Sequence, residues 1–369
     1  MNLKNLYISA GVLAVLAVIV SFLKNSNNAP LLDERVGTSL VEAAALRDTA
    51  KLVVEADGQT LTFDQDLDKK RWTLAEKHDL PVSASQMSAL VDTIVEAKLQ
   101  RFVSENPERI ATYGYDISPK IRFLGADGSE IVALDLGKKT DNGRQFVRYA
   151  GEEKAFLATA TFNVNSSLDS WLEKTLVSFE ADDVTSIEAT LQSGESLSAQ
   201  RDSSDADWSS DELPEGKILN QSSVGQIASR FAGLTFTATA ETNDANVIAA
   251  KENSHQFALG LSDGRRYAFT IGRQPEVKIE KEVEKEDENG EKTTETEEEI
   301  VTPEGPVYFF VSADDANDPI NGYMAKSAFE ASSYQYTSLP GALEDLLTDA
   351  PEPVEEAPPA PLVTAPEAN

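Results

Sequence analysis

The chain has 369 residues, of which 63 are acidic and 32 basic, so its formal net charge is -31. Phosphate backbones and anionic lipid headgroups would repel a surface of this charge, and we expect no nucleic acid partner. The chain contains no cysteine, which excludes disulfides, thiolate catalysis and thiol metal ligands. Its length corresponds to about two domains.

The chain begins with an uncharged apolar run over residues 6–23, LYISAGVLAVLAVIVSFL, held between Lys4 and Lys24. A run of this length is enough for a helix to cross a bilayer. A signal peptide needs small residues before its cleavage site, but Asn27 occupies the -3 position of a cut after Ala29. We therefore expect an uncleaved single-pass transmembrane anchor. The alternative is a buried helix of a soluble domain, although such helices rarely run so long without a charge.

The orientation of this anchor follows from topology, because the positive charges at its two ends nearly balance. A short amino-terminal tail commonly stays in the cytoplasm while a long following domain is exported. We expect residues 1–5 to be a cytoplasmic stub and residues 24–47 a linker. The predicted location is the inner membrane, with the large carboxyl-terminal domain in the periplasm.

Landmarks in the middle of the chain recur at one offset, which indicates an internal duplication. The pairs, each 136 residues apart, are Gly58 with Gly194, Trp72 with Trp208, and Asp127-Gly128 with Asp263-Gly264. Coincidence in a chain rich in glycine and aspartate is the alternative. The offset predicts two related lobes, the first over residues 48–178 and the second over residues 179–347.

The first lobe alternates strand and helix patterns. The strand patterns cover residues 51–55, 59–63, 71–74, 120–124, 130–136 and 145–149. From Ser83 onward apolar residues recur with a helical period, and a second helix is expected over residues 163–176. Helices packed on an antiparallel sheet bury both kinds of element, so the predicted fold class is α+β.

The second lobe repeats this order with weaker signals. Its strand patterns cover residues 187–191, 196–200, 256–261 and 265–271, and its helix lies near residues 222–232. A charged insert over residues 275–305 then precedes the next strand, at residues 306–311. This insert is the main difference between the two predicted lobes.

The insert allows two interpretations. Its low apolar content is typical of a disordered acidic loop. Asn289-Gly290, however, is a preferred hairpin turn. Pairing outward from this turn gives three cross-strand pairs: Asp287 with Lys292, Lys281 with Glu298, and Ile279 with Ile300. We favour a protruding two-stranded arm.

The carboxyl-terminal residues 348–369 are rich in proline, alanine and glutamate and have little to bury. We expect a disordered spacer. The alternative is a tail that reaches a partner, but no basic or aromatic residue marks a recognition motif.

Catalytic patterns are missing from the sequence. His78 and His255 lie in no zinc-binding or nucleophile motif, and we expect both to be surface residues. Two acidic clusters, 64–68 and 314–318, contain oxygen ligands for calcium but lack the spacing of a calcium loop. Solvated turns explain them better in so acidic a chain. We therefore predict no catalytic residues, no cofactor and no metal.

Four aromatic residues also allow two interpretations. Tyr113 and Tyr115 flank a glycine, and Trp72 and Trp208 hold equivalent places in the two copies. Each could form an exposed recognition surface, but aromatic residues at strand ends more often pack on the sheet. We expect packing.

Several of these features occur together in an order found in one family. They are the membrane helix, the glycine-turn hairpin, Arg71-Trp72-Thr73-Leu74, the amphipathic helix, and the segments 113–119, 121–128 and 134–137. This order resembles a bacterial domain-of-unknown-function family of membrane-anchored proteins, often encoded beside gliding-type ABC transporter genes. The resemblance is strongest over residues 46–176, whereas the second copy lacks the Tyr-Gly-x-Asp-x-x-Pro pattern.

The resemblance implies an accessory protein of an ABC-type transport or gliding-related complex, with ABC-type permease and ATPase subunits as partners. It implies no catalytic residues. Our first hypothesis is therefore a periplasmic scaffold that acts by protein–protein interaction and is not an enzyme. The alternative is a module that binds a small molecule, sugar or peptide, or a carboxylate hydrolase, using the cleft between the lobes.

Overall fold

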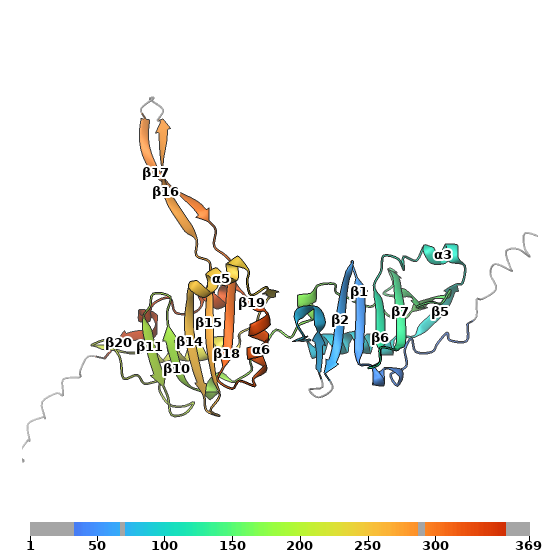
Figure 1. Ribbon diagram of the computed structural model, residues 1–369, viewed down its shortest axis with the longest axis horizontal. Coiled ribbons are helices and arrows are strands. Elements are labelled where there is room, and N and C mark those ends of the chain that lie inside the picture. Colours follow the sequence, from blue (N-terminus) through green and yellow to red (C-terminus); the bar gives the residue numbers. More distant parts are fainter. Residues whose placement is uncertain (1–32, 67–70, 287–291, 352–369) are drawn as a thin grey trace, which may run out of the picture. The chain divides into compact units, whose positions relative to one another are not determined.

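The computed structural model describes residues 33–66, 71–286 and 292–351 (Figure 1). The chain divides into two compact units, unit 1 (Met1–Glu173) and unit 2 (Lys174–Asn369). The predicted anchor at 6–23 and the residues from 352 onward in the predicted tail lie outside the described residues. Within those residues, no helix combines the length and the apolar character needed to cross a membrane.

Unit 1 is built on a nine-stranded antiparallel sheet with the strand order β4-β3-β2-β1-β6-β7-β8-β9-β5. The strands are β1 (Lys51–Ala56), β2 (Gln59–Asp66), β3 (Arg71–Leu74), β4 (Leu80–Pro81), β5 (Leu99–Ser104), β6 (Lys120–Leu124), β7 (Glu130–Lys139), β8 (Gln145–Tyr149) and β9 (Ala155–Ala158). Two helices join them, α2 (Ala84–Glu96) and α3 (Pro107–Ala111). The periodic face of α2 buries Met87, Leu90 and Ile94, as its spacing predicts.

Unit 2 is built on a seven-stranded antiparallel sheet with the order β11-β10-β14-β15-β18-β19-β13. The strands are β10 (Val184–Thr190), β11 (Ser196–Gln200), β13 (Ala238–Ala240), β14 (Ser254–Leu261), β15 (Arg266–Arg273), β18 (Val307–Ala313) and β19 (Ala328–Ala331). The helices are α4 (Gln221–Ala232), α5 (Ala245–Glu252), α6 (Pro319–Lys326) and α7 (Ser333–Thr337). Two short strands, β12 (Lys217–Leu219) and β20 (Leu347–Asp349), form a separate pair.

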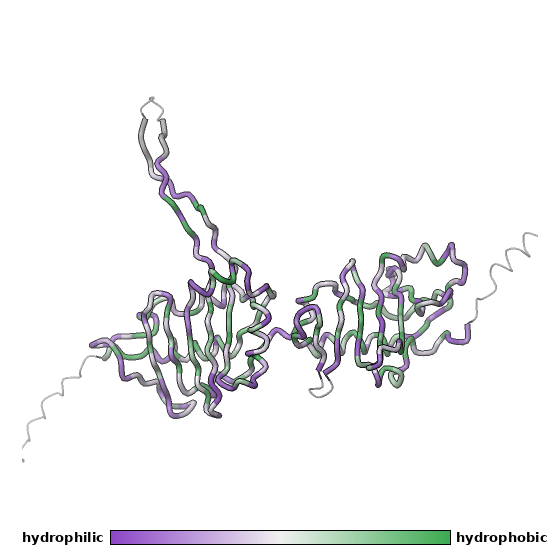
Figure 2. The backbone as a smooth tube through the Cα atoms, viewed as in Figure 1, coloured by the Kyte–Doolittle hydropathy of each residue, from purple (hydrophilic) through white to green (hydrophobic). Residues whose placement is uncertain are grey.

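The cores of both units are rich in phenylalanine. Hydrophobic residues alternate with hydrophilic ones along the strands, while the loops are mainly hydrophilic (Figure 2). Among the largest fully buried side chains are Phe63, Phe123 and Phe156 of unit 1 and Phe257, Phe269 and Phe329 of unit 2. Each sheet is therefore held by burial of large apolar side chains.

The two sheets share one strand order. In unit 1 the run β2-β1-β6-β7-β8-β9-β5 follows the same chain order as β11-β10-β14-β15-β18-β19-β13 in unit 2. The glycines that recur in the sequence lie in equivalent turns: φ is 77° at Gly58 and 88° at Gly194, 80° at Gly128 and 86° at Gly264. Glycine adopts this left-handed backbone without strain, which explains why it recurs at these positions.

A second pair of glycines marks where the chain leaves a helix and contacts the sheet. A Cβ atom on Gly137 of β7 would lie 2.8 Å from the carbonyl oxygen of Tyr113, and one on Gly272 of β15 would meet the carbonyl of Asn253. The following N–H donates to the same carbonyl, from Lys138 in unit 1 (2.7 Å) and from Arg273 in unit 2 (3.3 Å). Both units thus dock the segment after α3 or α5 in the same way.

The charged insert forms a hairpin, with strands β16 (Val277–Glu286) and β17 (Lys292–Thr302) paired only with each other. We refer to these two strands as the arm. The predicted hairpin is confirmed, but its predicted register was wrong by one residue: Lys281 pairs with Glu297, and Ile279 with Glu299. The last described pair joins Glu286 to Lys292. The predicted turn, Asn289-Gly290, lies outside the described residues.

The predicted helix over residues 163–176 was wrong. This segment contains only a 3-10 turn, Leu168–Trp171. Asn165 competes for backbone partners, because its side chain accepts from the N–H of Ser167 (2.8 Å) and its carbonyl accepts from the indole of Trp171 (2.8 Å). The chain then runs extended, with Leu172 bridged to Val82.

Candidate functional site

The arm exposes apolar side chains at its base. Val277 and Ile279 of β16 are 41% and 46% exposed, and Ile300 and Val301 of β17 are 54% and 49% exposed. Apolar residues on an isolated ribbon contribute nothing to the core of the sheet behind it. Lys278 pairs with Ile300 and Ile279 with Glu299, so Ile279 and Ile300 lie on opposite faces of the ribbon. Exposed apolar residues on both faces would suit a partner that wraps around the arm.

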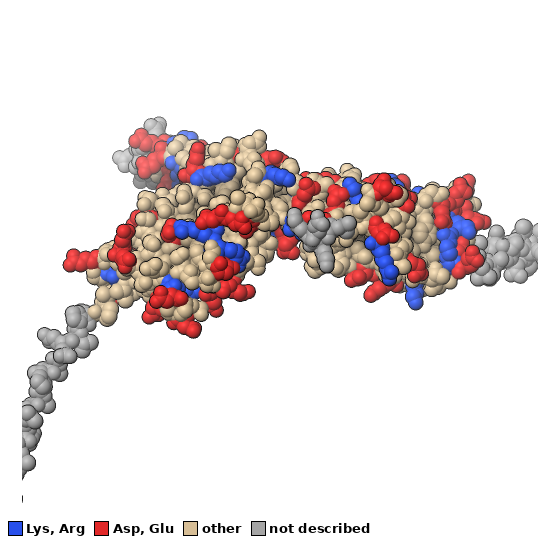
Figure 3. Space-filling view, turned by 60° about the horizontal axis from the view of Figure 1, so that its bottom comes forward, with Lys and Arg blue, Asp and Glu red and all other residues tan. Residues whose placement is uncertain are grey.

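The charge of the arm is strongly acidic. Residues 275–305 contain thirteen acidic and four basic side chains. Two of the four lysines in this segment are paired with glutamates: Lys278 lies 3.2 Å from Glu298, and Lys281 lies 3.1 Å from Glu299. The surplus is therefore negative, and it continues the acidic surface seen on both units (Figure 3). A binding partner for the arm would be basic around an apolar centre.

Unit 1 contains a cavity of about 530 Å³ beside α3, which we call the α3 cavity. Its volume falls within the range of small-molecule sites, roughly 300–1,000 Å³. The lining residues are Pro107, Ile110 and Ala111 of α3 together with Tyr115, Asp116, Lys120, Arg148, Glu152 and Glu153. The cavity thus combines an apolar wall with charges of both signs.

Tyr115 and Arg148 both line the α3 cavity. Tyr115 is 4% exposed, and in the described part of the chain its buried hydroxyl has no hydrogen-bond partner. Burial raises the pKa of this phenol, so it stays protonated as a donor. The guanidinium of Arg148 lies 4.7 Å from the centre of the Tyr115 ring and 2.8 Å from the carboxylate of Asp135, which is buried. Asp135 therefore holds Arg148 in place at the cavity, with its guanidinium on the Tyr115 ring.

The other charged residues that line the α3 cavity differ in whether they are already paired. Glu152 receives two hydrogen bonds from Arg35 (3.1 and 3.0 Å), and Lys120 lies 3.4 Å from Glu55. Within the described part of the chain, Asp116 and Glu153 make no hydrogen bond or ion pair. These two carboxylates are available to a ligand.

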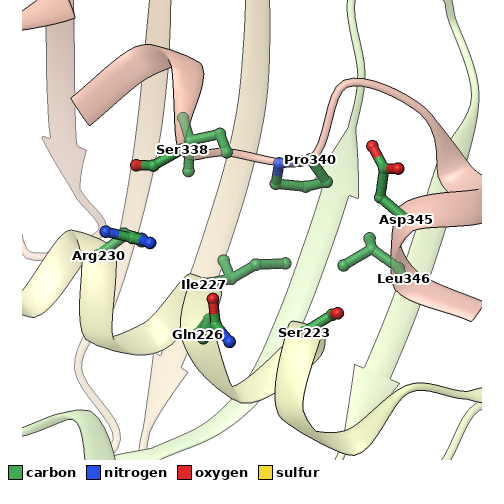
Figure 4. Close-up of a pocket in the computed structure, with 9 residues that line it drawn as sticks. Ser223, Gln226, Ile227, Arg230, Ser338, Pro340, Asp345 and Leu346 are labelled. Atoms are coloured by element: carbon green, nitrogen blue, oxygen red, sulfur yellow. The ribbon is translucent and has the colours of Figure 1, made fainter. Parts of the chain in front are cut away.

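Unit 2 has a smaller groove along α4. Two adjoining hollows of about 160 and 170 Å³ share Arg230, Ser338 and Leu339. Figure 4 shows Arg230, Gln226 and Ser223 on α4, facing the segment that carries Ser338 and Pro340. The guanidinium of Arg230 donates to the hydroxyl of Tyr334 (3.1 Å). Each hollow is smaller than an ordinary small-molecule site.

The chain just before β1 is bound to unit 1, although part of it was predicted as linker. Asp33 lies 3.2 Å from Arg35 and 2.9 Å from Lys154. Further along, the N–H of Leu40 donates to the carbonyl of Ala97 (2.7 Å). Hydrogen bonds from Lys154 and Arg35 hold the pKa of the Asp33 carboxyl far below its usual range. We call this set of ion pairs the Asp33 clamp.

The two histidines have different environments. His78 is exposed and has a left-handed backbone (φ 56°). The prediction of a surface position for His255 was wrong, because His255 is 6% exposed. It occupies an inward position of β14, two residues before the buried Phe257, and its Nδ1 accepts from the N–H of Gln192 (3.2 Å). Burial lowers the pKa of this imidazole.

The acidic clusters serve local structure. Asp64 pairs with Lys51 (2.9 Å), and Asp318 caps α6 by accepting from the N–H of Ile320 (2.9 Å). Asp68 lies outside the described residues. In the described ranges, no three histidine or acidic side chains come together to hold a metal ion.

The four aromatic residues pack as predicted, although Trp72 and Trp208 are not buried to the same extent. Tyr115 is buried, and the ring of Tyr113 stacks on Phe146 with 4.4 Å between centres. Trp208 is buried, while its counterpart Trp72 is half-buried. The α3 cavity beside Tyr115 was missed, because it depends on Arg148, which only the sheet brings close to it.

These features define a mixed α/β protein that is rich in antiparallel sheet and contains six α-helices in its described part. Residues 72–255 match the family model DUF4340, a domain of unknown function, so the chain contains a domain of this uncharacterised family. The match runs from β3 of unit 1 to β14 of unit 2 and includes every residue that lines the α3 cavity. No curated protein and no solved structure matches the chain.

Proposed function

We propose that this protein is a membrane-anchored periplasmic scaffold of an ABC-type transport or gliding-related complex and that it acts by binding other proteins. The observation that carries the proposal is the arm, with its four exposed apolar residues among glutamates. An isolated two-stranded ribbon adds little to stability, so its exposed surface suits a role outside the fold. The partners implied by the sequence resemblance are ABC-type permease and ATPase subunits.

The Asp33 clamp supports the membrane-proximal part of this proposal. Only residues 24–32 separate the predicted anchor from Asp33. A chain of this length spans at most about 30 Å when extended. The clamp would therefore keep unit 1 within that distance of the membrane surface, where a membrane complex presents its periplasmic side. Two related lobes from an internal duplication would provide the rest of the scaffold.

The test is crosslinking of the full-length protein in its native membranes, followed by gentle purification and mass spectrometry. A matched variant replaces residues 275–304 with Asn-Gly. The N–H of Gly305 already donates to the carbonyl of Gln274 (2.9 Å), so a two-residue turn can close the hairpin between β15 and β18. We expect the wild type to recover permease and ATPase subunits and the armless variant to lose them.

A control variant changes only the chemistry of the arm surface. Ile279→Thr combined with Ile300→Thr keeps the strand propensity and the acidic charge but removes two exposed apolar side chains. We expect at least a tenfold loss of recovered partner with folding unchanged. Equal recovery from wild type and both variants would contradict docking through the arm, and a protein that purifies alone would contradict the scaffold function.

A further inference from the structure

The elements around the α3 cavity are also present in unit 2, where they carry different side chains. In unit 2, α5 takes the place of α3 and packs Val247 and Ala250 against Tyr308 of β18 and Ala328 of β19. In unit 1 the corresponding cluster consists of Ile110, Tyr115 and Ala155, with Val103, Tyr113 and Phe146 packed against it. Both units thus pack apolar side chains where this helix meets the sheet, and in unit 1 the α3 cavity lies beside the cluster.

The two sheets also differ in one cross-strand pair next to this helix. Asp135 of β7 pairs with Arg148 of β8, and the equivalent pair in unit 2 is Thr270 of β15 with Phe310 of β18. An ion pair with a buried partner is weak support for stability, because desolvation offsets its attraction. The uncharged pair in unit 2 shows that the frame forms without one. The ion pair of unit 1 therefore suits a role toward a ligand.

The lining of the α3 cavity selects for a ligand with two opposite charges. Its lining contains the cations Arg148 and Lys120, which suit a carboxylate. It also contains Asp116 and Glu153, whose unpaired negative charge suits an ammonium group. A simple anion would be repelled by the carboxylates. The apolar residues of α3 in the same lining suit a hydrocarbon side chain.

We propose that the α3 cavity binds a small zwitterion with an apolar side chain, such as an amino acid or a short peptide with free ends. The carboxylate contacts Arg148, the ammonium contacts Asp116 and Glu153, and the side chain lies on α3. This site is within unit 1 and is separate from the arm, so the armless variant retains it. Loss of partner recovery and loss of zwitterion binding are therefore distinguishable results.

The test is calorimetric titration of the detergent-solubilised full-length protein with the dipeptide alanyl-leucine. Two blocked forms serve as probes of charge: the N-acetyl form lacks the ammonium, and the C-terminal amide lacks the carboxylate. We expect each block to weaken binding about tenfold, which corresponds to about 1.4 kcal/mol. Equal affinity for all three forms, or no binding of the free dipeptide at about 10 mM, roughly ten times a millimolar dissociation constant, would overturn the proposal.

Protein variants locate the site. Asp116→Asn with Glu153→Gln changes only exposed edge groups, so the fold is kept and we expect about tenfold weaker binding of the free dipeptide. Asp135→Thr with Arg148→Phe copies the pair found in unit 2, and we expect binding to be abolished while the sheet remains intact. The control is Glu188→Gln, on the surface of unit 2. Binding unaffected by both cavity variants would overturn the assignment.

Discussion

The sheets of units 1 and 2 place different chemistry at equivalent positions. Where unit 1 pairs Asp135 with Arg148, unit 2 pairs Thr270 with Phe310. Where unit 1 joins β7 to β8 by a short connection, unit 2 inserts the arm between β15 and β18. The comparison separates two kinds of position. Some hold the shared frame, such as Gly137 and Gly272, which we call the docking glycines, and others are free to take on a binding role.

The largest effect is expected at the docking glycines, which the comparison identifies as part of the frame. Gly137→Ala and Gly272→Ala each force a Cβ atom against a backbone carbonyl. We expect each variant to destabilise its own unit by about 3 kcal/mol. Hydrogen exchange measured separately on peptides of unit 1 and unit 2 checks this.

The control for that pair is Gly225→Ala in α4, where a Cβ would meet only the indole nitrogen of Trp208 at 3.7 Å. Alanine is the better helix former, so this variant is expected to stabilise unit 2 by about 0.5–1 kcal/mol. If Gly137→Ala or Gly272→Ala behaves like Gly225→Ala, the equivalence of the two docking sites is wrong.

A smaller loss of stability is expected when the Asp33 clamp is broken. The clamp belongs to unit 1, so only that unit should be affected. Asp33→Asn removes the charge that pairs with Arg35 and Lys154. We expect unit 1 to lose about 2 kcal/mol at pH 7. Chemical denaturation followed by hydrogen exchange measures the loss.

The pH dependence of this loss has a definite sign. Because the pKa of Asp33 is lowered in the folded state, its contribution is complete above the ordinary pKa of 3.8 and fades as pH falls below that value. The difference between wild type and Asp33→Asn should shrink on acidification. Asp263→Asn, in an exposed turn of unit 2, should leave unit 1 unchanged, and a constant difference at all pH values would contradict the clamp.

The smallest effect is expected at His255 and concerns unit 2. Burial lowers the pKa of this imidazole in the folded state, so the unfolded chain binds the proton more tightly. Unit 2 should lose stability as pH falls below about 6.5, the ordinary pKa of histidine. Thermal melts of wild type and His255→Gln between pH 7.5 and 5 test this.

The surroundings of His255 contain no acid that would reverse this sign, since in the described part of the chain its ring contacts Gln192, Phe257 and Tyr336. The melting temperature of His255→Gln should therefore fall less than that of the wild type on acidification. His78→Asn, at an exposed position of unit 1, should follow the wild type. If the melting temperatures of all three proteins fall in parallel, His255 does not cause the loss of stability of unit 2 at acidic pH.

The sequence predicts the hairpins well because their signal is local. Gly58 and Gly194 sit in turns whose backbone requires glycine, and the strands around them alternate in hydropathy. The amphipathic period of α2 is equally local. By contrast, α3, α5 and α6 have eight residues or fewer, which is too short for a clear helical period.

The candidate site could not be predicted because its parts meet only in the folded sheet. Arg148 and Asp135 lie 13 residues apart and face each other through the register of β7 and β8. Gly137 and Gly272 are 135 residues apart, whereas the landmarks of the duplication are 136 apart. A search at the common offset therefore does not pair these two glycines. The arm register was wrong by one residue because its charged residues look alike at neighbouring positions, so the sequence does not distinguish one register from the next.

The hydrogen bond between Gly305 and Gln274 at the base of the arm has a mechanical consequence. This bond joins the two points at which β15 and β18 continue into the arm. Because β16 and β17 pair only with each other, a force on the arm would act along both strands and pass into β15 and β18. These two strands are neighbours in the middle of the seven-stranded sheet, so a partner that pulled on the arm would load unit 2 at its centre and not at an edge.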